Sequence, residues 1–128
     1  MGKLPLPQPT EVELQILRIL WELGPSVVRS IHQRLEAAKG TNYSTTVKML
    51  SVMVEKGLLA RDENKQPLVF RAVLTRERAG KKMVNDLIDK VFNGSSASLV
   101  LQALSTGKAT PEELLEVRRL LDEMDGAK

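Results

Sequence analysis

The stretch over residues 43–71 constrains the fold of this chain more than any other. It opens with the hydroxyl-rich run Tyr-Ser-Thr-Thr at 43–46 and keeps apolar residues at helical spacing as far as Gly57. Two short apolar-rich runs follow at once, at 58–61 and 68–73, with a polar turn between them. This order predicts a helix that ends at a glycine and leads directly into a β-hairpin.

Two further helices are predicted before this stretch. Thr10 and Glu13 have the spacing of a capping box, which predicts a first helix over residues 11–23. Ser26 can cap a second helix, which the stretch 37–42 ends. Three helices followed by a hairpin have the element order of a winged helix-turn-helix, a mainly α fold with a small β-hairpin wing.

The predicted third helix has two unlike faces when its residues are spaced at about 100°. One face carries apolar residues together with Thr46, and the other is small, hydroxylic and centred on Lys48. Small side chains let a helix approach DNA base edges closely, and Ser, Thr and Lys can hydrogen-bond there. Any amphipathic helix has a polar face, so the pattern gains weight from the hairpin that follows it. The outward-facing residues are Ser44, Thr45, Lys48, Ser51, Val52 and Glu55.

The chain is predicted to be helical from Thr75 onward. Thr75 caps a long helix that ends before Asn93-Gly94, and a shorter helix covers residues 95–104. Thr110 and Glu113 form a second capping box, with a proline at the first helical position, and start the last helix.

These last helices carry more apolar surface than they can easily bury alone. Pairing with a second copy through a twofold interface is the economical solution, and packing onto the chain's own first domain is the alternative. We therefore expect a winged-helix DNA-binding domain over residues 1–75 and a three-helix dimerisation domain over residues 76–128. The residues expected at the dimer interface are Met83, Leu87, Val91, Leu99, Val100, Leu114, Val117 and Leu121.

The net charge of +3 is small but unevenly distributed. Residues 1–75 carry ten Lys/Arg and seven Asp/Glu, whereas residues 76–128 carry nine of each. Between Pro25 and Arg61 six basic residues stand against two acidic ones. This distribution fits a division into nucleic-acid contact and self-association, although ordinary solvated charge explains it equally well.

Composition excludes several classes of site. The chain has no cysteine and one histidine, so disulfides, thiolate or His-rich metal sites and cysteine nucleophiles are excluded. The carboxylates fall on helix faces and caps, so we expect neither an enzyme nor a cofactor. No apolar run approaches the roughly 20 residues of a membrane span and no signal peptide is visible, so we expect a soluble cytoplasmic protein. His32 lies off the apolar stripe of its helix and is expected at the surface.

These patterns make a DNA-binding protein the leading hypothesis. Base contacts are expected from the third helix, and phosphate contacts from basic residues around it. The alternative is a protein-interaction module, since winged helices also serve as adaptors, and it predicts no sequence-specific DNA binding. The expected DNA contacts on the third helix are Ser44, Thr45, Thr46, Lys48, Ser51 and Val52. The expected phosphate contacts are Arg29, Arg34, Lys56, Arg61 and Lys65.

Several short runs of sequence are together specific in their order and spacing. They are Pro9 to Leu14, Leu20-Trp21, Tyr43 to Val47, Glu55 to Leu59, Phe70-Arg71, Val91 to Ser95, Glu112 to Leu114 and Leu120 to Glu123. Taken together they cover nearly the whole chain and resemble the penicillinase repressor family of bacterial regulators (BlaI/MecI/CopY).

The resemblance implies a homodimeric winged-helix repressor that binds a dyad-symmetric operator. Each third helix would read one half-site, with half-site centres roughly 34 Å apart. In the family, a membrane-bound sensor metalloprotease pathway leads to cutting of the repressor in its dimerisation region, which weakens bivalent DNA binding. The corresponding bond in this chain joins Gln102 and Ala103.

The sequence departs from the family pattern at several positions. Val52 stands where an arginine is frequent and Lys48 where a small hydroxyl residue is frequent, so the operator is expected to differ from the family's familiar one. Better-known members are cut before an aromatic residue, and Ala103 occupies that position here. The copper-responsive branch has cysteine pairs near its C-terminus, and their absence excludes copper sensing.

Overall fold

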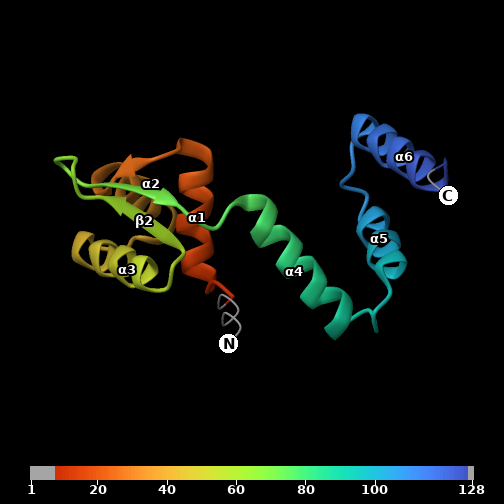
Figure 1. The fold of residues 1–128 in the computed structure, drawn as a ribbon, viewed down its shortest axis with the longest axis horizontal. Helices are drawn as coiled ribbons and strands as arrows, with labels where there is room; N and C mark the ends of the chain where they lie inside the picture. The colour runs from red at the N-terminus through yellow and green to blue at the C-terminus, as the bar shows by residue number, and fades with distance from the viewer. Residues whose placement is uncertain (1–7, 127–128) are drawn as a thin grey trace. The chain divides into compact units, whose positions relative to one another are not determined.

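A computed structural model describes residues 8–126, and it consists mainly of helices with one small antiparallel sheet (Figure 1). This confirms the predicted fold class. The chain forms two compact units, residues 1–83 and residues 84–128, and the boundary expected at residue 75 lies just before α4. The elements in chain order are α1 (Glu11–Leu23), β1 (Ser26–Val27), α2 (Val28–Lys39), α3 (Tyr43–Glu55), β2 (Leu59–Asp62), β3 (Val69–Ala72), α4 (Arg76–Lys90), α5 (Ser96–Ser105) and α6 (Pro111–Gly126).

The sheet contains a strand that the sequence analysis does not predict. β1 pairs antiparallel with β3, and β3 pairs antiparallel with β2, which gives the order β1-β3-β2. Ser26, the predicted cap of α2, instead pairs with Phe70 in this sheet. Val27 takes the N-cap position without a side-chain hydrogen bond. The capping prediction is therefore wrong, because the backbone of Ser26 is drawn into the sheet.

The core of the first unit lies where α1, α2, α3 and the sheet meet. Burying an aliphatic side chain of this size stabilises the fold by about 1.5–3 kcal/mol relative to leaving it exposed. Gly57, with φ at 81°, turns the chain from α3 into the hairpin, as the sequence predicts. Trp21 packs against this core, and its indole N–H donates to the carbonyl of Leu74 at 2.9 Å. The fully buried aliphatic and thioether side chains are Ile16, Leu17, Ile31, Leu35, Leu50, Met53 and Leu58.

The second unit contains the end of α4 together with α5 and α6. At the start of α6, Thr110 and Glu113 exchange both hydrogen bonds of the predicted capping box, at 2.9 and 3.1 Å. None of the unit's described residues, 84–126, is buried. No helix in the described part of the chain is long and apolar enough to cross a membrane.

Glu13 joins the beginning of α1 to the end of α3. One carboxylate oxygen accepts from the amide of Thr10 at 3.0 Å and completes the predicted capping box, in which Thr10 accepts from the Glu13 amide at 3.2 Å. The other oxygen accepts from Lys56 Nζ at 2.7 Å. Burial raises the pKa of Glu13, but the hydrogen bonds from Lys56 and Thr10 outweigh it and hold that pKa below its ordinary value.

We predict that Glu13→Gln destabilises the fold and removes part of its acid sensitivity. Because the pKa of Glu13 is lowered in the folded state, its ionised form contributes stability above the ordinary carboxyl pKa. That contribution is lost as the pH falls through the lowered value. The variant should lose about 1–2 kcal/mol at pH 7, since Lys56 is partly solvated, and should resemble the wild type more closely at pH 3.

Urea denaturation at both pH values measures this effect. Glu63→Gln is the matched control, because Glu63 pairs with Arg61 on the exposed hairpin and belongs to no cap. An equal loss of stability at pH 7 and pH 3 in Glu13→Gln would contradict the role of its charge.

Candidate nucleic-acid interface

The outward face of α3 is the main candidate surface. Its inner face packs into the core through Leu50 and Met53, both fully buried. The structure therefore brings five of the six expected contact residues of this helix to one exposed surface. These five are Ser44, Thr45, Lys48, Ser51 and Val52.

Asn42 organises the first turn of α3. Its Oδ1 accepts from the amide of Thr45 at 2.9 Å and from the hydroxyl of Ser44 at 3.0 Å. Its carbonyl accepts from the amide of Thr46 at 3.1 Å. The helix therefore begins at Tyr43 behind an asparagine cap. Since the Ser44 hydroxyl donates to this cap, it presents only acceptor lone pairs to solvent.

Thr46 and His32 occupy other environments than the sequence predicts. Thr46 is fully buried, and its Oγ1 lies 2.9 Å from Nδ1 of His32. The His32 side chain is 12% exposed and packs edge-on against the ring of Tyr43. The expected DNA contact by Thr46 does not fit this burial, and the expected surface position of His32 is wrong. Both differences arise because α2 packs directly against the first turn of α3.

Two exposed residues of α3 have no assigned role in the sequence analysis. Tyr43 is 49% exposed and Val47 is 40% exposed, and they lie one helical turn apart beside the polar face. Both stand near the edge of the apolar stripe, where helical spacing alone does not decide between core and surface. They form an apolar border beside the polar surface around Lys48. Apolar side chains in this position are suited to contact with thymine methyl groups.

Three of the cations expected to contact phosphate are already paired within the chain. A paired cation must exchange its partner before it binds phosphate, so it gains less from DNA than an unpaired one. The hydrogen bond from Arg34 also lowers the pKa of Glu22. The pairs are Arg34–Glu22 at 2.7 Å, Lys56–Glu13 at 2.7 Å and Arg61–Glu63 at 3.1 Å.

The remaining expected cations are unpaired. Arg29 at the start of α2, Lys48 on α3 and Lys65 at the hairpin tip are exposed, and none forms an ion pair with any residue in the range 8–126. They come from α2, from α3 and from the turn of the hairpin, and both α2 and β2 of the hairpin contact α3. These three side chains are therefore the strongest candidates for contact with a polyanion.

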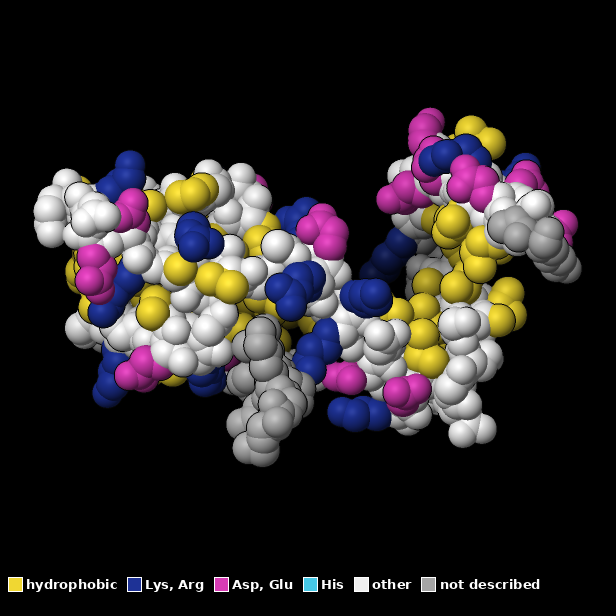
Figure 2. All heavy atoms as spheres, viewed as in Figure 1, with side chains coloured by type: hydrophobic (Ala, Val, Ile, Leu, Met, Phe, Trp, Pro, Cys, Tyr) yellow, Lys and Arg dark blue, Asp and Glu magenta, His cyan; other side chains and the backbone are white. Residues whose placement is uncertain are grey.

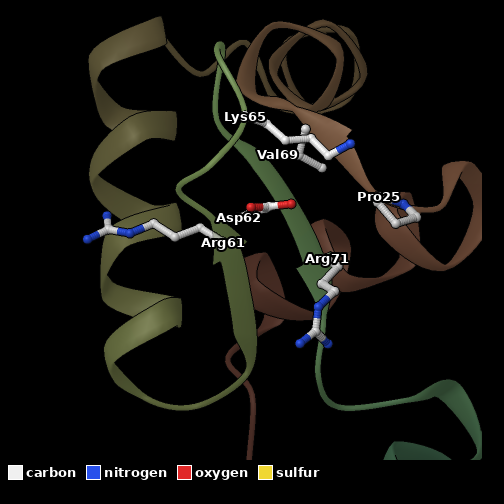
Figure 3. Close-up of a pocket in the computed structure, with 6 residues that line it drawn as sticks. All are labelled: Pro25, Arg61, Asp62, Lys65, Val69 and Arg71. Carbon is white, nitrogen blue, oxygen red and sulfur yellow. The ribbon is translucent and has the colours of Figure 1, made fainter.

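A hollow of about 640 Å³ lies over the outer side of the hairpin (Figure 3). Asp62 and Arg61 of β2 both line it, and their side chains extend in different directions from the strand. Lys65 and Arg71 line its rim. A carboxylate inside the hollow repels anions, so we expect phosphate to be met at the basic rim rather than within.

Charge divides more sharply between the two compact units than between the predicted domains. Residues 1–83 carry fourteen Lys/Arg and eight Asp/Glu, while residues 84–128 carry five and eight. The first unit is thus basic by six charges and the second acidic by three. In Figure 2, dark-blue basic side chains are scattered over the first unit, and yellow apolar side chains gather over the second. Residues 76–82 at the start of α4 carry four Lys/Arg and one Glu, and this net charge of three produces the difference.

Comparison with known proteins identifies the family. The sequence matches the penicillinase repressor family over residues 9–123. It is 20% identical to the penicillinase repressor of Bacillus licheniformis over 118 residues, which cover 92% of each chain. It is also 20% identical to the methicillin resistance regulatory protein MecI of Staphylococcus aureus (strain N315) over 113 residues, covering 88% of this chain and 92% of MecI.

Among solved structures, a MarR family transcriptional regulator from Silicibacter pomeroyi DSS aligns with 93% of this chain and 68% of its own. The identity is 24% and the TM-score 0.42. The match to the family covers most of the chain, from the cap of α1 to the last turns of α6. The chain belongs to the penicillinase repressor family and is a transcriptional repressor of the winged-helix type rather than an enzyme.

Proposed function

We propose that this repressor binds a dyad-symmetric DNA operator as a homodimer, with α3 of each copy in the major groove of one half-site. The observation that carries the proposal is the outward face of α3, where unpaired Lys48 stands among small hydroxyl side chains. Ser, Thr and Lys can hydrogen-bond to base edges in the major groove. Arg29 and Lys65, from the elements beside α3, would fix the helix through phosphate contacts.

The exposed apolar residues of the second unit support self-association. Ten leucine, valine and methionine side chains between residues 84 and 124 are from 41% to 69% exposed, and no described residue of this unit is buried. An apolar surface of this kind is costly in water and is typical of a protein interface. A second copy covers it most simply, because each chain offers the same surface to the other. Those above 55% exposed are Val91, Leu101, Leu115, Leu121 and Met124.

We also propose that proteolysis within the second unit relieves repression. Gln102 and Ala103 are both exposed but lie within α5. Proteases bind extended chain, so cutting this bond requires local unfolding of α5, which its lack of buried residues makes easy. The cut would detach α6 and weaken the dimer. The protein would act in the cytoplasm, downstream of a membrane sensor metalloprotease pathway.

A salt-controlled binding titration tests the proposal, using the DNA upstream of the protein's own gene and a random duplex as competitor. We expect a preference of about a thousandfold or more, with one dimer bound per palindrome. Equally weak, salt-sensitive binding to both duplexes would contradict it. That outcome would favour the protein-interaction module, with a partner on the α3 surface.

Lys48 provides a test of base recognition. Lys48→Ala should weaken operator binding by about 1–3 kcal/mol and leave random-duplex binding almost unchanged, because a lysine that contacts a base discriminates between sequences. Fluorescence anisotropy titrations on both duplexes measure the difference. Lys108→Ala, an exposed lysine of the second unit, is the control. An equal loss on both duplexes would instead make Lys48 a phosphate contact.

Leu121 provides a test of dimerisation. Leu121→Asp places a charge within the exposed apolar surface of α6 and should shift the protein to monomers in sedimentation experiments. Operator affinity should fall by about 10²–10⁴-fold as bivalent binding is lost. Asn85→Asp introduces the same charge at an exposed polar position of α4 and should remain dimeric. A dimeric Leu121→Asp would remove α6 from the proposed interface.

A further inference from the structure

His32 is the side chain of α2 that reaches the first turn of α3. Its Nδ1 lies 2.9 Å from Thr46 Oγ1, and its ring meets Tyr43 edge-on, with ring centroids 5.2 Å apart and planes at 78°. Tyr43 and Thr46 are three residues apart and therefore lie on one side of this turn. One imidazole thus holds two residues of the turn that begins the recognition surface.

The hydrogen bonds around Thr46 assign the donor in this contact. The Thr46 hydroxyl donates to the carbonyl of Asn42 at 3.4 Å, so its lone pairs are left to accept. The tautomer of His32 that matches this arrangement has the proton on Nδ1 and donates it to Oγ1. Nε2 faces Glu36 at 3.9 Å, whose side chain is 61% exposed.

The location of this contact distinguishes it from general core packing. Only the residues 40–42 separate α2 from α3, and the Asn42 cap acts within α3 and its own turn. The hydrogen bond from His32 instead ties α3 to a neighbouring helix, at a fully buried hydroxyl. A short bond at one end of a helix restrains the angle of that helix. Lys48 lies within one turn of Thr46, so this angle sets where Lys48 points.

We propose that His32 is a positioning residue, which sets the angle of α3 through Thr46 and Tyr43 and thereby the discrimination between operator and random DNA. The inference rests on the proposed function. Contacts to phosphate tolerate small changes in angle because they are largely electrostatic, whereas base contacts need matched geometry. Loss of the His32 contact should therefore reduce specific binding and leave non-specific binding unchanged.

Asparagine and glutamine form the matched pair of substitutions. The amide nitrogen of asparagine is bonded to Cγ, and so is Nδ1 of histidine. His32→Asn therefore keeps a hydrogen-bond donor near Thr46. His32→Gln has the same polar group one carbon further out. We expect His32→Asn to bind the operator within about twofold of the wild type and His32→Gln to bind it about three- to tenfold more weakly. Random-duplex affinity should be the same in both.

Thr46 supplies a second, independent pair of variants. Thr46→Ser keeps the accepting hydroxyl, whereas Thr46→Val keeps the shape and removes it. Thr46→Val should lose about as much operator affinity as His32→Gln, and the double variant should lose no more than either single one. All affinities are measured on variants that circular dichroism shows to be folded. The Thr46 pair decides the question if a His32 variant fails to fold.

Three outcomes would overturn the proposal. They are equal operator affinities for His32→Asn and His32→Gln, a parallel loss on operator and random DNA, and additive losses at His32 and Thr46. Failure of the proposed function gives a different result, since the wild type itself would then show no preferred duplex. In that case, amide hydrogen exchange at residues 45–46 still tests the positioning role, and His32→Gln should speed it relative to His32→Asn.

Discussion

The burial of one face of α3 is the constraint on which the rest of the first unit depends. Leu50, Met53 and the hydroxyl of Thr46 are fully buried against the neighbouring helices and sheet. Because helical side chains keep a fixed angular order, burying these residues determines which others face solvent. The position of Lys48 and of the hydroxyl residues around it therefore follows from apolar packing on the opposite side of the same helix.

The two compact units differ in how fully they bury their own apolar side chains. The first has a closed core of aliphatic side chains, whereas the second leaves leucines on α5 and α6 largely exposed. A unit that lacks buried residues gains little stability by itself, and its folding is coupled to whatever covers it. In the proposed dimer this coupling makes operator affinity sensitive to a single cut or charge in the second unit, without any change at the DNA-binding surface.

Local signals in the sequence predict the fold well where the structure is itself local. The capping boxes at Thr10 and Thr110 and the glycine at residue 57 mark element ends that the structure confirms. β1 is not predicted from the sequence because two residues have no periodicity, and their pairing partners lie more than forty positions away.

Three features of the candidate site are not predicted from the sequence for a related reason. The pairing of Lys56 with Glu13, the partial burial of His32 and the exposure of Val47 depend on how separate helices pack, which no single helix encodes.

The pairing state of the cations separates the attraction of DNA from the recognition of its sequence. In the proposed complex, attraction depends on net charge and acts over about a Debye length, so the positive excess of the first unit would provide it whichever cations are paired. In the same proposal, recognition of the base sequence depends on the direction of α3, and contacts at both ends of this helix restrain its angle. His32 restrains the first turn, and the Glu13–Lys56 pair ties the last turn to α1. Lys56 thus helps to position the outward face of α3 by restraining the end of the helix, even though its charge is paired with Glu13. A winged helix of modest net charge can in this way achieve specificity through the placement of a few unpaired side chains, with Lys48 at their centre.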